Sequence, residues 1–494
     1  MSTTFPTAGL WMLATLGTLI VTTGLPVWVL LIGSASAFAM LGLTLGAMDV
    51  DVLNAISVRT LGLLEHDLLQ ALPLYVFIGV LLQRLTVADA LFATLARLPG
   101  RGAASTALAA MGVGTLVAPM NGSVASTSAL LARLVAPRLG RMDAGAATAL
   151  VSVAATIGVV VPPSLVLILL GDAMLRAHTE ASNLKGYALG AQRIINTQDV
   201  FHAALMPAAC VLLLWLAVAW WQGRRMAPAP TAPATRRQWL VAATSVAAVV
   251  LLLTGVFRGT VFAVEGAATA GVALVAATLA SRALSREQWQ TVLLDTLALS
   301  GALLALLVGA TTFSLVFRLW GTDRWISELV LGSSLPALPT AALVLTLVAL
   351  CAWVLDAFEM IFVIIPIVAP PLIILLGDAQ QAAVLLLLVL QLSFLIPPMG
   401  YAVMMARTRS GLASVAIGPT LRALGPYLGV QCAVTMAVFI LPATVHALDS
   451  PAPNALESAA PNEQDVEQLM RDMASQGQTA DTAPQTESTN PPRP

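Results

Sequence analysis

Two apolar runs of the chain are each interrupted by a pair of adjacent prolines. The first is VVVPPSLVLILL, residues 159–170, and the second is FLIPPMGYAVMM, residues 394–405. Proline lacks a backbone N–H, clashes with the preceding helical turn and biases the residue before it away from helical angles. Each pair should therefore end a helix inside an apolar segment, and the fold must accommodate two interrupted apolar helices.

The composition places these runs in a membrane. Hydrophobic residues make up 58% of the 494 residues and charged residues only 10%, whereas soluble domains carry about a quarter charged residues. We therefore predict an all-α polytopic membrane protein, with room for about a dozen spans of ~20 residues in residues 1–448. The runs at 163–173 and 398–406 are too short to cross a bilayer alone. No basic residue precedes the first apolar run, so we expect a transmembrane helix there and not a cleaved signal peptide.

Other protein classes find little support in the sequence. Three cysteines and four histidines are scattered along the chain, without the spacing of a disulfide framework or a metal site. No nucleophile–base pair or phosphate-binding loop is present, so we expect neither an enzyme nor an organic cofactor. Nothing indicates a nucleic-acid partner, and the lipid bilayer is the expected surrounding.

The two double prolines belong to a longer repeated pattern. They lie 235 residues apart (397 − 162), and the related strings LVAPRL and IVAPPL precede them by similar spacings, 25 residues from Pro137 and 27 from Pro370. Two divergent halves that are each interrupted at the matching position are the sequence indication of a secondary transporter with inverted repeats. Coincidence is the alternative, since proline is more frequent in membrane helices than in soluble ones.

The repeat divides the chain into four segments. They are a first membrane half at 1–221, an arginine-rich linker at 222–238, a second membrane half at 239–448 and a tail at 449–494. The linker holds four arginines, so the positive-inside rule places it in the cytoplasm. The tail has 8 acidic and 2 basic residues among many Pro, Ser, Thr and Gln, and is expected to be disordered. Residues 174–200 are expected to form one long polar loop.

The breaks themselves are candidate binding sites. Irregular backbone within a membrane is tolerated only where it is buried or lines a cavity. The carbonyl groups freed at one half-helix end can coordinate Na⁺, and the N–H groups at the other end can face an anion. The alternative is a proline kink with a structural role only. The candidate residues are Thr156, Gly158, Pro162, Pro163 and Ser164 at the first break, and Gln391, Ser393, Pro397, Pro398 and Gly400 at the second.

A second polar group follows the interruption in APMNGSVASTSALLARL, residues 118–134. Its candidate residues, which offer oxygens or backbone N–H groups at the start of a helix, are Asn121, Gly122, Ser123, Ser126 and Thr127. Such a helix start suits a carboxylate or helps to close a cation site. The alternative is a helix N-cap with a small-residue packing face.

Acidic residues inside apolar runs are rare. Asp356 and Glu359 are three residues apart and so are expected on one helical face, and Glu265 lies in another run. Intramembrane acids are costly and indicate function by default. The alternative for Asp356 is that it only begins a helix, where an acid complements the helix dipole.

With these motifs the chain resembles the large permease subunit, DctM-like, of tripartite ATP-independent periplasmic (TRAP) transporters. The resemblance covers about residues 25–448. It is carried by LPLYVFIGVLLQRL (72–85), NGSVASTSALLARLVAPRL (121–139), ATIGVVVPPSLVLILLGDAM (155–174), GVFRGTVFAVEGAATAGVAL (255–274), LDAFEMIFVIIPIVAP (355–370) and QLSFLIPPMGYAVMM (391–405).

The resemblance implies an elevator-type transporter of the bacterial inner membrane. It implies two inverted repeats that each carry a helical hairpin, Na⁺ bound near the hairpin tips, and an organic acid anion as the solute. A separate small four-helix membrane subunit and a periplasmic substrate-binding protein are the implied partners. On this reading Asn121 to Ser123 mark the first hairpin, Thr156 to Ser164 its partner break, and Gln391 to Gly400 the break of the second half.

Three positions differ from the family pattern. Glu265 stands without the Thr and Pro that usually precede it, Ile396 replaces a usual Thr, and Val159 replaces a Gln common in one branch of the family. Two other interpretations stay open beside the TRAP subunit. One is a stand-alone carboxylate or Na⁺/H⁺ antiporter of similar design, and the other is a membrane scaffold subunit without transport.

Overall fold

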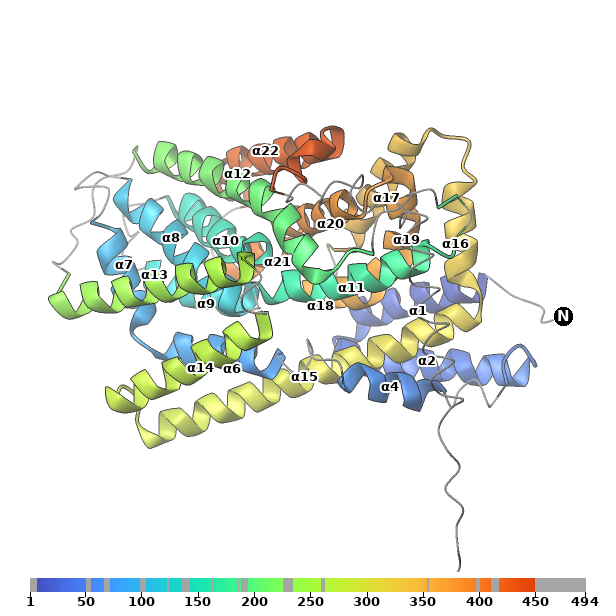
Figure 1. Cartoon of the computed structure of the whole chain (residues 1–494), viewed down its shortest axis with the longest axis horizontal. Coiled ribbons are helices and arrows are strands. Elements are labelled where there is room, and N and C mark those ends of the chain that lie inside the picture. Colours follow the sequence, from blue (N-terminus) through green and yellow to red (C-terminus); the bar gives the residue numbers. More distant parts are fainter. Residues whose placement is uncertain are drawn as a thin grey trace, which may run out of the picture. The chain divides into compact units, whose positions relative to one another are not determined.

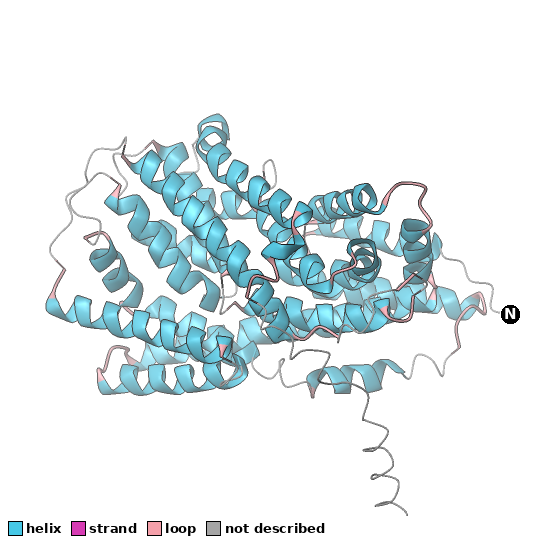
Figure 2. Ribbon diagram, turned by 45° about the horizontal axis from the view of Figure 1, so that its top comes forward, coloured by secondary structure: helices cyan, strands magenta, loops and turns pink. Residues whose placement is uncertain are grey.

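The chain folds into helices throughout the part that the structure describes. The computed structural model describes residues 7–49, 55–65, 72–97, 104–121, 124–135, 143–161, 164–184, 186–187, 194–224, 234–258, 263–352, 355–396, 400–409 and 417–448. All regular elements in these ranges are helical (Figure 2), so the prediction of an all-α chain is confirmed. The described residues up to Leu448 belong to one compact unit, Met1–Leu448. The predicted acidic tail lies outside the described residues.

Figure 1 shows how the helices are arranged. In chain order they are α1 (Thr7–Thr23), α2 (Val27–Thr44), α4 (Ala55–Leu64), α6 (Leu72–Arg84), α7 (Val87–Leu95), α8 (Ser105–Asn121), α9 (Val124–Val135), α10 (Ala144–Val160), α11 (Leu165–Ala181), α12 (Thr197–Gly223), α13 (Arg236–Phe257), α14 (Ala263–Ala280), α15 (Arg286–Leu319), α16 (Thr322–Leu331), α17 (Ala337–Cys351), α18 (Ala357–Glu359), the π-helical η2 (Met360–Ile364), α19 (Ile365–Leu376), α20 (Ala379–Ser393), α21 (Tyr401–Arg409), α22 (Ile417–Ile440) and the 3-10 turn η3 (Pro442–Thr444).

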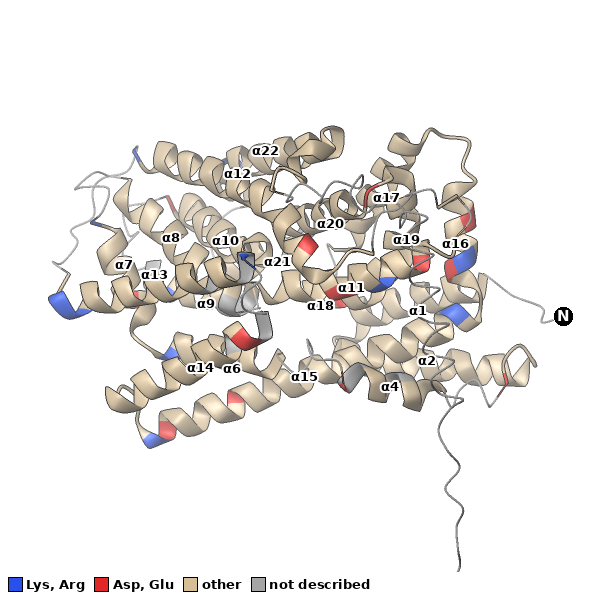
Figure 3. Ribbon diagram, in the orientation of Figure 1, with Lys and Arg blue, Asp and Glu red and all other residues tan. Residues whose placement is uncertain are grey.

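Length and composition mark several helices as membrane spans. Five helical stretches among the described residues qualify, namely α2, α12, α15, the stretch Ala357–Leu376 and α22. Counting the bent pairs α6–α7 and α10–α11 as single spans raises the number to seven. Shorter apolar helices lie between them, and charged residues are sparse along the ribbon (Figure 3). The chain is a multi-pass membrane protein.

The two halves share one order of helices. A shift of 235 residues carries Ala144, where α10 begins, onto Ala379, where α20 begins (379 − 144). Under this shift each of the six helices from α6 to α11 meets a counterpart. The pairs are α6 with the last part of α15, α7 with α16, α8 with α17, α9 with η2 and the start of α19, α10 with α20, and α11 with α21. The repeat seen in the prolines therefore extends over the helices around them.

Packing follows the same relationship. Helix α9 returns from α8 and packs against α21, the second segment of the other half's broken helix. Helix α19 stands in the corresponding place and packs against α11. Each hairpin therefore contacts the broken helix of the opposite half, so the two breaks share one core.

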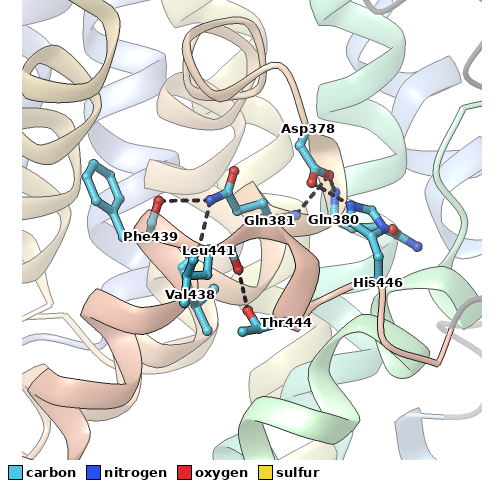
Figure 4. Close-up of polar contacts among 8 residues, drawn as sticks. All are labelled: Asp378, Gln380, Gln381, Val438, Phe439, Leu441, Thr444 and His446. Carbon is cyan, nitrogen blue, oxygen red and sulfur yellow. Dashed lines mark hydrogen bonds and ion pairs between the residues drawn. The ribbon is translucent and has the colours of Figure 1, made fainter.

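The N-terminus of α20 is held by the end of α22 (Figure 4). Asp378 accepts hydrogen bonds at Oδ1 from the backbone N–H groups of Gln380 (2.9 Å) and Gln381 (3.1 Å), and its Oδ2 lies 2.7 Å from Nε2 of His446. The side-chain amide of Gln381 donates to the carbonyl oxygens of Val438 and Phe439. These bonds satisfy orphan groups at both helix ends and fix where the first segment of the second broken helix begins.

The expected loop at 174–200 is shorter than predicted. Helix α11 continues to Ala181 and α12 already begins at Thr197, so the prediction was wrong for residues 174–181 and 197–200. Asp172 and Arg176 form an ion pair (2.6 Å) on successive turns, and His178 is buried, with Nε2 2.9 Å from the hydroxyl of Tyr187 and Nδ1 accepting from the N–H of Ile195 (3.1 Å). These polar residues have partners within a helix and its connecting segment, so they do not end the helix.

Candidate transport site

Ser164 organises the first break. Helix α10 ends at Val160 and α11 begins at Leu165, so the break lies where the double proline was expected to put it. The hydroxyl of Ser164 donates to the carbonyl oxygen of Gly158 (2.6 Å) and accepts from the N–H of Leu167 (3.4 Å). One buried side chain therefore ties the end of α10 to the start of α11. Pro162 and Pro163 lie outside the described residues.

The end of α10 lies against the first hairpin at backbone distance. A Cβ added to Gly158 would stand 2.4 Å from the carbonyl carbon of Ala118 on α8, and one added to Gly114 would stand 2.5 Å from the carbonyl oxygen of Ala154. Small residues permit this approach, as is common between membrane helices. The predicted site residue Gly158 thus has a clear packing role.

The side-chain amide of Gln391 links the second break to the first. Gln391, near the end of α20, donates from Nε2 to the carbonyl oxygen of Thr156 (3.2 Å). Both residues are buried, and the hydroxyl of Thr156 donates back to the carbonyl of Val153 (2.9 Å). The side chain of Gln431 on α22, which the sequence analysis did not single out, donates to Oε1 of Gln391 (3.0 Å) and to the carbonyl of Leu388 (3.2 Å). Three helices of both halves meet in this amide cluster.

The rest of the second break is only partly described. The N–H of Ala402 donates to the carbonyl oxygen of Phe394 (3.1 Å), which bridges the interruption. A Cβ on Gly400 would stand 3.0 Å from the carbonyl oxygen of Ile396. Pro397 and Pro398 lie outside the described residues, as does the side chain of Ser393.

The first hairpin turns at the predicted polar group. Asn121 ends α8 and α9 begins at Val124, while Gly122 and Ser123 lie outside the described residues, as do the side chains of Asn121 and Ser126. Thr127 is buried, in keeping with either of the two interpretations of this segment. Its function as a binding site stays a prediction.

Asp356 and Glu359 occupy the tip of the second hairpin. Asp356 precedes α18 and forms a capping box with Glu359, whose Oε2 accepts from the backbone N–H of Asp356 (3.0 Å). Asp356 therefore stands at the start of a helix, and the binding function of the pair stays a prediction. The 235-residue shift carries Gly122 onto Ala357, so this tip matches the Asn121–Ser123 tip. Each tip lies 40 residues before its double proline (162 − 122 and 397 − 357). This equal spacing could have shown from the sequence alone that the two tips correspond. Glu265, by contrast, is exposed in the first turn of α14.

A cavity of about 540 Å³ lies between α11 and α15, with η2 and α19 completing its wall, and the sequence analysis missed it. Its lining is mixed, with charged and hydroxyl side chains among apolar ones. Its ionisable lining residues form two ion pairs, Arg176 with Asp172 (2.6 Å) and Arg318 with Glu180 (2.5 Å). The charged residues are visible in the sequence because they interrupt apolar segments. The pairing of Glu180 with Arg318 could not be predicted, since the two lie 138 positions apart. A second cavity of about 360 Å³ is apolar, lies against α1 and α2, and includes Glu359 in its lining.

The described residues contain no group of three or more His, Cys, Asp or Glu side chains placed to hold a metal ion. An alkali cation at the breaks would instead take backbone carbonyl and hydroxyl oxygens. In the last turn of α10 the carbonyl oxygen of Ile157 accepts from the N–H of Val161 and that of Gly158 from the hydroxyl of Ser164, and each has a second lone pair with which to bind a cation.

Comparison with known proteins settles the family. The family model described as "Tripartite ATP-independent periplasmic transporter, DctM component" matches residues 15–444. The chain belongs to the DctM family. The resemblance noted from the double-proline blocks is thereby confirmed, and the chain is a membrane component of a transporter.

Two curated relatives of this DctM-family chain are named as TRAP transporter permeases. The C4-dicarboxylate TRAP transporter large permease protein DctM of Pseudomonas aeruginosa is 24% identical over 426 residues, which cover 83% of this chain and 93% of that protein. The isethionate TRAP transporter permease protein DctMQ of Oleidesulfovibrio alaskensis is 21% identical over 415 residues, 81% of this chain and 60% of that protein. Among solved structures, the Alcanivorax borkumensis YdaH transporter shares the fold with a TM-score of 0.56 at 14% identity, covering 87% of this chain and 98% of that one.

Proposed function

We propose that this DctM-family chain is the large membrane subunit of a TRAP-type secondary transporter that couples the entry of Na⁺ to the uptake of a small carboxylate. The observation that carries the proposal is the bond from Gln391 to the carbonyl of Thr156. It joins the two interrupted helices in one buried core. Paired broken helices at a repeat interface are where secondary transporters hold substrate and coupling ion.

The chemistry of the breaks supports both ligands. Carbonyls of the last turn of α10, together with hydroxyls such as those of Thr156 and Ser164, are oxygen donors for Na⁺. The first turns of α11 and α21 present backbone N–H groups, which favour an anion. This pairing supports the entry of a cation together with an anion, and the choice of a carboxylate among anions rests on the family resemblance. The curated relatives' names mention C4-dicarboxylate and isethionate.

The distribution of arginines supports a topology. Arg224 follows α12, and Arg282 and Arg286 flank the start of α15, so both of these ends belong in the cytoplasm under the positive-inside rule. The start of α12 and the end of α15 then lie on the opposite, periplasmic face. The end of α11, joined to the start of α12, is on that face too. The ion pair between Glu180 of α11 and Arg318 of α15 independently brings these two ends together.

The partners and mechanism follow the family. We propose an inner-membrane location, a small four-helix membrane subunit and a periplasmic binding protein that delivers the solute. The hairpins and broken helices, α8–α11 and α17–α21, would move as an elevator against a scaffold that includes α2 and α15. The name DctMQ of one relative is in keeping with a second membrane component.

Uptake into proteoliposomes tests the proposal. The full chain is reconstituted with its small subunit and cognate binding protein, and uptake of succinate, isethionate and other small acids is measured under separate Na⁺ and H⁺ gradients. We expect uptake of an acid that requires the Na⁺ gradient and the binding protein, and its loss in Ser164→Ala and Gln391→Leu with Gly301→Ala unaffected. Uptake without the binding protein would favour a stand-alone antiporter, and absence of uptake of any solute a scaffold subunit.

A further inference from the structure

We infer that Arg318 is a carboxylate-binding residue of a vestibule between α11 and α15, and that Glu180 occupies it until a solute carboxylate takes its place. This inference rests on the proposed function for the identity of the solute class. The site is separate from the first break, since Glu180 lies 16 residues, or about 24 Å of helix, beyond Ser164.

Two polar stripes face each other across the cavity. On α15 the lining includes Thr311, Ser314 and Arg318, spaced by three and four residues and so on one face. On α11 and the residues after it, the polar lining comprises Asp172, Arg176, Thr179, Glu180 and Asn183. Elsewhere both helices bury mostly apolar residues. Polar stripes on two facing membrane helices indicate a cavity that admits water and polar solutes.

The two ion pairs differ in what they join. Asp172 and Arg176 lie on one helix, so their pair stays intact if α11 moves. Glu180 and Arg318 belong to different helices, and their contact bridges the cavity. Any separation of α11 from α15 must therefore break the second pair and leave the first.

Arg318 is suited to exchanging partners. Its side chain is 33% exposed and that of Glu180 is 25% exposed, so both are accessible from the cavity. The contact with Glu180 uses one terminal nitrogen of Arg318, whereas a guanidinium carries five N–H groups in a fork that matches a carboxylate. Partly exposed ion pairs contribute little stability, so a free carboxylate can compete with Glu180. Thr311 and Ser314 line the same cavity on the two helical turns before Arg318, where they can meet other polar groups of the solute.

The consequence is a link between arrival of the solute and release of the helix. On the proposed topology the vestibule opens on the periplasmic face, where a binding protein would deliver its cargo. A solute carboxylate on Arg318 frees Glu180, which removes the contact that bridges α11 and α15. The arriving anion thus loosens α11 from α15 before it reaches the breaks.

Thiol protection tests this exchange without requiring transport. Cys210, Cys351 and Cys432 are replaced in the full chain, Ser314→Cys is introduced, and its alkylation by the uncharged reagent N-ethylmaleimide is timed with increasing succinate. Succinamide at equal ionic strength is the uncharged control. We expect succinate but not succinamide to slow the reaction.

Variants of the ion pair then separate exchange from general electrostatics. Glu180→Gln removes the competitor, so half-maximal protection should need up to about fivefold less succinate. Arg318→Lys keeps the charge but loses the fork, so protection should weaken. Asp295→Asn, which breaks the ion pair between Arg84 and Asp295 elsewhere on α15, should behave as the unmodified background. Thr311→Cys provides a second reporter position if Ser314→Cys does not fold.

Each result decides the inference. Equal protection by succinate and succinamide, or identical succinate dependence in the Glu180→Gln, Arg318→Lys and Asp295→Asn variants, would overturn it. Suppose instead that the protein shows the expected succinate protection in every variant and yet transports no acid. That result would refute the proposed function but would still support the carboxylate site.

Discussion

Gln391 donates a hydrogen bond to the carbonyl oxygen of Thr156, and the two residues are exactly one repeat, 235 positions, apart. Residues related by the repeat therefore contact each other, which places the junction of the two halves at this bond. Both residues are buried, at 1% and 0% exposure. The two breaks are consequently coupled through the core and do not lie in independent helices.

The amide cluster predicts non-additive losses of stability. Gln391→Leu should destabilise the chain by about 1–3 kcal/mol, because it leaves the carbonyl of Thr156 buried without this donor. Gln431→Leu removes the donor to Oε1 of Gln391, so the double variant should lose less than the sum of the two single losses, by roughly 0.5–3 kcal/mol. Thermal unfolding of the purified protein measures this, with the exposed Gln290→Leu as the control. Strictly additive losses would contradict a shared network.

The close approach of α8 and α10 predicts that alanine destabilises the chain at Gly158 but not at a glycine with open space around it. Gly158→Ala places a Cβ 2.4 Å from the carbonyl carbon of Ala118, a backbone atom that cannot rotate away. We expect a loss of about 1–3 kcal/mol from overpacking, seen as a lower Tm.

Gly301→Ala is the matched control for that substitution. Gly301 also lies within a helix, but a Cβ there would have nothing within 4 Å. Because alanine favours the helix by ~1 kcal/mol over glycine, this variant should be unchanged or slightly more stable. An equal loss in both variants would refute the close-contact explanation.

The sequence reveals features that depend on neighbouring residues, but not contacts between residues far apart in the chain. The double prolines act on their own backbone, so both breaks and the repeat between them could be predicted. Asp356 and Glu359 were expected on one helical face, but whether the pair caps a helix depends on where that helix begins, and the hairpin turn decides this. Gln431 stands 40 positions from the Gln391 side chain that it contacts. Such a contact needs the packing of α22 against α20, which no local pattern shows.

The capping box at the second hairpin tip predicts that stability needs a hydrogen-bond acceptor at position 359 more than a negative charge. Glu359 accepts from the N–H of Asp356, and the amide oxygen of Glu359→Gln can accept the same bond. Glu359→Gln should therefore keep most of the stability, whereas Glu359→Leu should lose about 1 kcal/mol, as expected for a lost cap.

Thermal unfolding and uptake together separate the two roles open to Glu359. A glutamine variant that is stable but inactive would show that the carboxylate charge itself serves transport. A glutamine variant as unstable as the leucine variant would contradict the capping role.

The topology predicts opposite labelling of two alanines. The side-chain amide of Gln222, beside Arg224, donates to the carbonyl of Ala423 near the start of α22 (2.8 Å), so the far end of α22 lies on the face away from the arginines. Ala447, just beyond that end, should be periplasmic, and Ala283, between α14 and α15, cytoplasmic. In a background with the three native cysteines replaced, a membrane-impermeant maleimide should label Ala447→Cys but not Ala283→Cys in intact spheroplasts. Inside-out vesicles should reverse the pattern, and labelling of both positions from the same face would refute the helix directions on which the periplasmic vestibule depends.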